Sequence, residues 1–348
     1  MVTSVLSPLA APAIDSHSWP KILLRYRDPT LWRSIAEIAL TLAPLAVLWV
    51  AMILVARISL WLVLPLAIPA GCFVARIFMI QHDCSHGAFF RARLANAWVG
   101  RVAGVLTMTP YDYWRRTHAI HHATTGNLDQ RGIGDVDTLT VQEYLARSWW
   151  GRLGYRLYRH PAVLFGVGPA YLFILQHRLP IGYLRSREWG PWVSTMATNL
   201  GIAALAGGMI WLIGLRDFLM IQISVMLIAA AIGVWLFYVQ HQFEQTRWEN
   251  TENWDHPDAA LFGSSHYALP RPLGWLTANI GIHHVHHLCS RIPFYRLPEV
   301  LRNHPELAAV GKLTLWKSFA CVRLTLWDEA KRKLISFETL RRERKWQR

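Results

Sequence analysis

Four long stretches of apolar residues dominate the pattern of the chain. Few charges interrupt them, and they fall at about 36–56, 58–80, 193–214 and 218–240. A helix needs about 20 residues to cross a hydrocarbon core of roughly 30 Å, so each stretch is long enough to span a bilayer. The pattern therefore predicts an all-α integral membrane protein with four transmembrane helices.

Two shorter apolar stretches accompany the four spans. The stretch 161–176 contains Pro161 and Pro169, and we expect it to be interfacial or re-entrant. The stretch Trp98–Met108 is expected to lie along the membrane surface. The whole chain, 1–348, is interpreted as one membrane domain. Its remaining parts are a helical cap over 81–192 and 241–330 and a charged tail over 331–348.

The basic residues are distributed unevenly along a chain whose net charge is +14. Residues 1–35 hold four of them, residues 81–192 hold thirteen and residues 241–348 hold sixteen, whereas the two short connections hold only Arg57 and Arg216. The positive-inside rule then places both termini and the cap in the cytosol, with the spans in the cytoplasmic (inner) membrane. We interpret the basic excess as attraction to anionic head groups and to an acidic protein partner, and not to nucleic acid.

Three clusters of histidines stand out among the polar segments. Each has helical spacing, so its imidazoles share one helix face. The first follows the second span directly, and topology places all three at the same face of the membrane. The clusters read HxxxH, HxxHH and HxxHH, with the residues His82 and His86, then His118, His121 and His122, then His283, His286 and His287.

Eight imidazoles exceed what one tetrahedral zinc ion binds, and they suit two metal ions that share a site. His241 ends the fourth span, and we propose it as a ninth ligand, although it could instead anchor a helix end. His284 lies off the face of its cluster and is expected in the surroundings of the ligands or at the surface. No metal role is assigned to the isolated histidines His17, His160, His177, His256, His266 and His304.

Sequence around these clusters resembles the membrane fatty acid desaturase family, and its Δ12/ω-6-type acyl-lipid branch in particular. The resemblance covers roughly 75–300. It rests on the three histidine boxes and on the stretches His82-Asp-Cys-Ser-His-Gly87, Trp114-Arg-Arg-Thr-His-Ala-Ile-His-His-Ala-Thr-Thr-Gly-Asn-Leu-Asp129, Gln240-His-Gln-Phe-Glu244 and Asn279-Ile-Gly-Ile-His-His-Val-His-His-Leu288. One departure is His266, where an aromatic or apolar residue is expected.

The resemblance implies a di-iron centre that uses dioxygen and two electrons to place a cis double bond in a membrane-lipid acyl chain. It carries the eight box histidines over as iron ligands, and His241 matches the position of an additional ligand in related desaturases. Removing hydrogen from an unactivated methylene requires a redox-active metal, which excludes zinc.

Several other residues near the boxes are candidates for supporting roles. The carboxylates could orient imidazole N–H groups, or they could pair with the abundant arginines. The aromatic residues could line a substrate entry, or they could form an interfacial belt. The carboxylates are Asp83, Asp112, Asp129, Asp135, Asp137, Glu244 and Asp255, and the aromatics are Tyr111, Tyr113, Trp114 and Trp275.

The chain shows no motif of a fused electron carrier, neither a haem-binding His-Pro-Gly-Gly nor a ferredoxin cysteine set. Electrons are therefore expected from a separate ferredoxin, flavodoxin or cytochrome-type protein. An acidic carrier would be attracted to basic residues of the cap such as Arg115 and Arg116, which could alternatively bind lipid phosphate.

Two other functions could use the same histidines. A related hydroxylase, ketolase or alkane monooxygenase would use the same boxes, but the flanking stretches favour a desaturase. A metal or haem transporter would place histidines along the spans near the membrane midplane, and none of the histidines lies well inside a span.

Overall fold

The computed structural model describes residues 15–132, 134–183 and 188–346. Within them, four helices are long and apolar enough to cross a membrane. They are α2 (Leu31–Ala56), α3 (Val63–Ser85, extended at its start by a short 3-10 turn, Leu60–Leu62), α9 (Trp189–Ile213) and α10 (Leu215–His241). The prediction of a helical membrane protein with four spans is confirmed.

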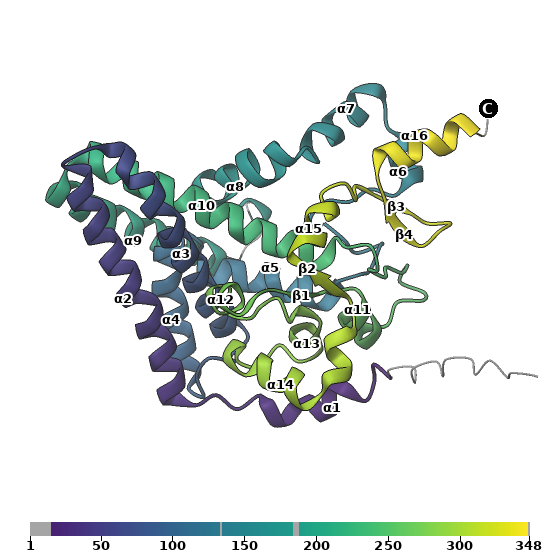
Figure 1. The fold of residues 1–348 in the computed structure, drawn as a ribbon, viewed down its shortest axis with the longest axis horizontal. Helices are drawn as coiled ribbons and strands as arrows, with labels where there is room; N and C mark the ends of the chain where they lie inside the picture. The colour runs from purple at the N-terminus through teal and green to yellow at the C-terminus, as the bar shows by residue number, and fades with distance from the viewer. Residues whose placement is uncertain (1–14, 133, 184–187, 347–348) are drawn as a thin grey trace, which may run out of the picture.

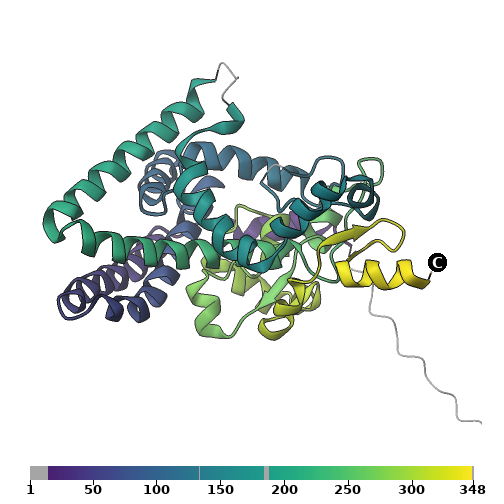
Figure 2. The same cartoon turned by 90° about the horizontal axis from the view of Figure 1, so that it is seen from above.

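The long helices lie together on one side of the molecule and the cap on the other (Figures 1 and 2). Helix α10 packs against α3, which also packs against α2. Buried aliphatic side chains such as Met52, Val63 and Val225 fill the space between these three helices. Gly214 makes the tight connection from α9 to α10, because its φ of +87° is a conformation that L side chains rarely adopt.

Shorter helices build the cap and the approaches to it. The first half of the chain supplies α1 (Trp19–Leu23), α4 (Arg93–Leu106), α5 (Tyr111–Thr124), α6 (Val141–Ala146), α7 (Trp149–Tyr158) and α8 (Gly168–Ala170). The second half supplies α11 (His256–Phe262), α12 (Arg271–Leu276), α13 (His283–Leu288), α14 (Leu297–Asn303), α15 (Leu315–Cys321) and α16 (Phe337–Trp346).

Two small sheets accompany these helices in the part of the chain that the structure describes. Strand β1 (His266–Ala268) pairs in parallel with β2 (Lys312–Thr314), and β3 (Leu326–Asp328) pairs antiparallel with β4 (Lys333–Ile335). Each strand has three residues, which is too short for an alternating pattern to be visible in the sequence. The tail predicted as charged thus contributes a strand before its helix, α16.

The stretch predicted as interfacial or re-entrant forms a run of short helical turns from Val163 to Tyr183. It is long and apolar enough to form a span only together with α7, from which it is bent by 58° at a break that contains Pro161. Proline disrupts helical hydrogen bonding, which accounts for a bend at this point. The stretch predicted along the membrane surface is the second half of α4.

Candidate metal centre

The ends of two spanning helices carry the first imidazoles of the site. Helix α3 runs without a break into the first box, so His82 lies inside it and His86 is its C-terminal cap. Helix α10 ends at His241. The boxes on α5 and α13 approach these ends from the cap, and Figure 1 shows the four elements meeting at the centre of the molecule. The prediction that the three boxes meet is confirmed.

Two contacts of Tyr111, at the start of α5, fix this helix relative to α4 and α3. The Tyr111 ring fills the space that a Cβ at Gly100 of α4 would occupy. Its hydroxyl donates a hydrogen bond to the carbonyl oxygen of Cys84 at 2.9 Å. Tyr111 is buried and therefore belongs neither to a substrate entry nor to an interfacial belt.

The nine candidate imidazoles fall into two groups, and within each group the potential ligand atoms lie within 4.8 Å of one another. Seven of these side chains are buried and two, His86 and His122, are half-buried. The first group contains His82, His86, His118, His122 and His286, and the second contains His121, His241, His283 and His287.

Distances between ring nitrogens fit the coordination of a shared cation. The Nε2 atom of His122 lies 3.1 Å from Nε2 of both His118 and His286, and Nε2 of His283 lies 3.0 Å from Nε2 of both His241 and His287. A neutral imidazole has one N–H, so such a chain of nitrogen contacts cannot be satisfied by hydrogen bonds alone. Two nitrogens bound at about 2.1 Å to one ion lie about 3.0 Å apart at a right angle and about 3.4 Å apart at the tetrahedral angle.

The donor set thus fits a metal ion with more than four ligands better than a tetrahedral zinc site. The imidazoles are also held in the neutral form that binds metals. Burial, reinforced by neighbouring imidazoles, lowers the pKa of His118, His122, His283, His286 and His287 well below the ordinary value.

Two carboxylates hold imidazoles of the site. Asp135 Oδ1 lies 2.5 Å from Nδ1 of His121, whose buried Nε2 has no hydrogen-bond partner among the described residues. Asp83 Oδ1 lies 3.1 Å from Nδ1 of His82, and its Oδ2 accepts the backbone N–H of Phe294 at 2.6 Å. In both pairs the carboxylate leaves Nε2 of the imidazole facing the site, as in carboxylate–histidine–metal arrangements.

The other predicted carboxylates lie elsewhere. Asp112 pairs with Arg101, Asp129 accepts the backbone N–H of Thr251, and Asp255 caps the start of α11. Asp137 and Glu244 are exposed. For these five residues the orienting role was wrong, because hydrophilic side chains close in sequence to a box can lie on a different face of the chain.

Trp114 is a neighbour of the site that lies one helical turn before His118. The two rings stack at 4.3 Å between centroids, with 16° between their planes. The sequence makes Trp114 a candidate for a substrate entry or an interfacial belt, and in the structure its ring packs against an imidazole of the site. The helical spacing of four residues was the signal that could have found this contact.

His284 is the one histidine of the third box that the structure keeps out of both groups. It is fully buried, and its Nε2 lies 2.9 Å from the carbonyl oxygen of Leu307, so the alternative of a surface position was wrong. Burial lowers the pKa of His284 to about 3. His266, the departure from the family pattern, packs beside it at 5.6 Å between ring centroids and bonds to the carbonyl oxygen of Ala308.

Four apolar helices with groups of imidazoles that could hold metal ions near their ends define a class of helical membrane proteins. Comparison with known proteins gives the family. A sequence model of the fatty acid desaturase family matches residues 59–319, and the chain belongs to this family. It is therefore a desaturase-type oxidoreductase.

Individual relatives agree with this assignment. A fatty acid desaturase of Bacillus subtilis (strain 168) is 42% identical over 321 residues, which cover 92% of this chain and 90% of that protein. An sn-1 acyl-lipid omega-3 desaturase (ferredoxin) of Synechocystis is 26% identical over 286 residues, covering 78% of this chain and 74% of the relative. An sn-1 oleoyl-lipid 12-desaturase of the same organism is 26% identical over 280 residues, with 80% and 76% covered.

Proposed function

We propose that this protein introduces a cis double bond into an acyl chain of a membrane lipid, using dioxygen and two electrons at a di-iron centre. The observation that carries the proposal is the convergence of nine imidazoles into groups of five and four at the ends of apolar helices. A bound pair of redox-active ions would activate dioxygen, the oxidant that removal of hydrogen from an unactivated methylene requires.

Each group of imidazoles would hold one iron ion, so His241 acts as a ligand together with the eight box histidines. Other residues of the chain position these ligands. Asp83 and Asp135 orient His82 and His121, and the Trp114 ring restrains His118. Burial of most of the imidazoles excludes bulk water from the centre, which favours attack on the acyl chain over side reactions.

We further propose that the acyl chain enters from the lipid side, because α3 and α10 carry ligands at the point where they leave the apolar spans. The Δ12/ω-6 position of the double bond is supported by the Synechocystis 12-desaturase among the relatives. The omega-3 enzyme of the same organism has the same identity to this chain, so the product must be located directly.

Electrons would come from a separate carrier. The name of the Synechocystis omega-3 enzyme includes ferredoxin, which supports a small acidic donor for this chain as well. We place the active site and both termini on the cytosolic side of the inner membrane, on the basis of the basic residues that flank the spans. Arg116 is half-exposed and already pairs with Glu188, so docking of the carrier would rely more on Arg115.

Expression in a bacterial host, followed by mass spectrometry that locates double bonds in the extracted lipids, tests the proposal. We expect new cis double bonds that disappear in the His121→Ala variant. The Arg302→Gln variant, which changes an exposed residue on α14, serves as the control for expression. A hydroxylated or ketone product would contradict desaturation and would favour the related oxygenases.

A further inference from the structure

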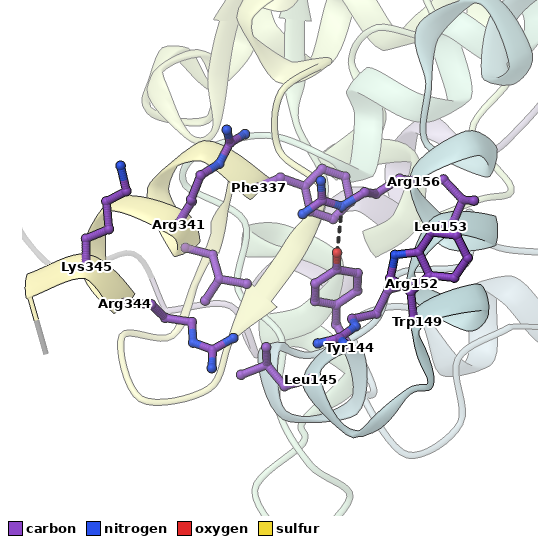
Figure 3. Close-up of a pocket in the computed structure, with 11 residues that line it drawn as sticks. Tyr144, Leu145, Trp149, Arg152, Leu153, Arg156, Phe337, Arg341, Arg344 and Lys345 are labelled. Carbon is purple, nitrogen blue, oxygen red and sulfur yellow. Dashed lines mark hydrogen bonds between the residues drawn. The ribbon is translucent and has the colours of Figure 1, made fainter. Parts of the chain in front are cut away.

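A basic pocket lies between α6, α7 and α16, with a volume of about 450 Å³. Figure 3 shows its side chains. Five of them are cationic, three are aromatic, and none of the described residues in the lining is a carboxylate. The lining residues are Tyr144, Leu145, Trp149, Arg152, Leu153, Arg156, Phe337, Leu340, Arg341, Arg344 and Lys345.

One of the cations is held in a fixed position. The Nε atom of Arg156 donates a hydrogen bond to the hydroxyl of Tyr144 at 2.7 Å, and its guanidinium lies 5.1 Å from the ring centre of Phe337. These contacts occupy one edge and one face of the guanidinium and leave other N–H groups for a ligand. A pre-positioned guanidinium loses less conformational entropy when it binds an oxyanion.

Nearby carboxylates do not neutralise the pocket. On α16, Glu338 pairs with Arg342 and Glu343 pairs with Lys331. Arg342 and Lys331 do not line the pocket, so these two carboxylates are engaged by cations outside it. The excess positive charge of the pocket therefore attracts an anion. Its concave shape suits a compact group such as a phosphate better than the flat surface of a protein.

Helix α7 also presents an apolar edge to the outside. Trp149 and Trp150 are 59% and 71% exposed, and Leu153 and Leu157 follow at intervals of one helical turn. A helix with tryptophan and leucine along one edge and arginine beside it is typical of segments that lie in the head-group layer of a membrane. The apolar run Val163–Tyr183 follows α7 after the bend. If this run enters the membrane, α7 lies close to the membrane surface.

The pocket is remote from the metal centre. Figures 1 and 2 place α16 at the outer end of the cap, whereas α13 lies at its middle. A carrier protein bound at α16 would be badly placed for electron transfer to the imidazole groups. This position favours a lipid over an acidic redox partner as the occupant.

We propose that the pocket binds the phosphate of an anionic phospholipid, while the tryptophan and leucine edge of α7 lies among the head groups. Arg152, Arg156 and Arg344 would contact the phosphate oxygens. The site is a fixed lipid contact of the cap, separate from the acyl chain on which the enzyme acts. It does not depend on the reaction that the metal centre performs.

Lipid binding to the full-length protein in detergent tests the proposal, with native mass spectrometry as the readout. The probes are phosphatidylglycerol, phosphatidylcholine with the same acyl chains, and inorganic phosphate. We expect phosphatidylglycerol to bind more tightly than phosphatidylcholine. Arg156→Gln and Arg344→Gln should each weaken its binding about fivefold, since one basic residue near an anionic surface contributes about that factor.

Matched variants keep the test independent of folding. Arg344 is exposed on α16, so its loss leaves the core intact, and Arg344→Lys should restore most of the affinity. Arg302→Gln, outside the pocket, should bind phosphatidylglycerol like the unmodified protein. Equal binding of both lipids, or unchanged binding in the two glutamine variants, would overturn the proposal.

Two other results would overturn the proposal by showing that the pocket binds something other than a lipid. If inorganic phosphate displaced phosphatidylglycerol at equal concentration, the pocket would be a site for a soluble anion. If the glutamine variants kept phosphatidylglycerol binding but raised the KM for an electron carrier, the pocket would be a carrier-docking site. Lipid binding is measured without turnover, so failure here is distinguishable from failure of the proposed desaturation.

Discussion

The guanidinium of Arg76 on α3 and the carboxylate of Glu37 on α2 form an ion pair inside the helical bundle, and both side chains are 1% exposed. Arg76 also donates to the carbonyl oxygen of Trp275 and to Oγ1 of Thr41, and its guanidinium lies 4.3 Å from the ring centre of Trp275. Arg76 therefore links α2 and α12 to the helix that carries the first histidine box.

Breaking this ion pair from one side should be costly. Glu37→Gln alone is expected to lower the free energy of unfolding by about 3–5 kcal/mol, because it leaves the buried guanidinium of Arg76 without its carboxylate. Arg76→Met should cost less, because Glu37 keeps its ion pair with Arg33. The double variant should be more stable than either single variant. The free energy of unfolding can be measured in mixed detergent micelles. If the loss in the double variant equalled the sum of the two single losses, the explanation would be contradicted.

Removal of the carboxylate beside His121 should weaken metal binding. Asp135→Asn is expected to lower the affinity of the second imidazole group for its metal about 10–100-fold, a typical effect for a carboxylate that orients a ligand. Asp137→Asn is the matched control, since Asp137 is exposed and two residues away. Metal content after dialysis against a weak chelator is the measurement, and equal retention by the two variants would argue against the role of Asp135.

Two histidines in the third box should respond differently to alanine. His286→Ala is expected to remove metal from the group of five imidazoles and to abolish activity. His284→Ala should destabilise the fold by about 1–3 kcal/mol, because it empties a buried position and removes one of the two hydrogen bonds at the carbonyl oxygen of Leu307, while the metal content stays at two ions. Loss of metal in folded His284→Ala would show that this residue belongs to the ligand set.

The metal-free protein should become less stable in mild acid. Burial lowers the pKa of His118, His122 and His283, so these imidazoles bind no proton in the folded state, whereas the unfolded chain takes up protons below about pH 6.5. Stability is therefore full above that pH and decreases as pH falls through it. Melting temperatures of chelator-treated protein between pH 7.5 and pH 5.5 should decrease. A flat profile would mean that the cluster opens without metal.

Membrane orientation can be checked with reporter fusions. Fusions after residues 57, 130, 216 and 348 should report outside, inside, outside and inside, because the basic residues flank the spans on one side. An outside signal at residue 130 would separate α5 from the cytosolic carrier and would contradict the proposed electron supply.

The sequence predicted the spans well but not their ends. Helix α2 begins at Leu31, five residues before the predicted start of the span at 36, because the helix includes a first turn with Arg33 that precedes the apolar run. The apolar pattern also gave no role to Glu37, which lies inside the predicted span. Glu37 is instead buried against Arg76, a partner 39 residues away that no local pattern could reveal. Apolar runs report burial in lipid, whereas ion pairs inside the bundle depend on tertiary packing.

The imidazoles were found in sequence because helical spacing is a local property. Their division into two groups could not be predicted from the sequence, since it depends on how α5 and α13 are oriented relative to α3 and α10. Burial of His284 escaped prediction for the same reason, because Leu307 reaches it from a distant part of the chain. Asp135 and Asp137 could not be told apart, because only the fold determines which of them faces His121.

The groups are interleaved: neighbouring His121 and His122 on α5 belong to different groups, and so do His286 and His287 on α13. Consecutive residues of a helix are separated by a fixed rise of about 1.5 Å and a turn of about 100°. If each group bound one metal ion, the spacing between the two ions would thus be set by the rise and rotation per residue of these two helices. Movements of the cap against the bilayer would carry both positions together as one unit, and a one-residue insertion in α5 would disturb both at once.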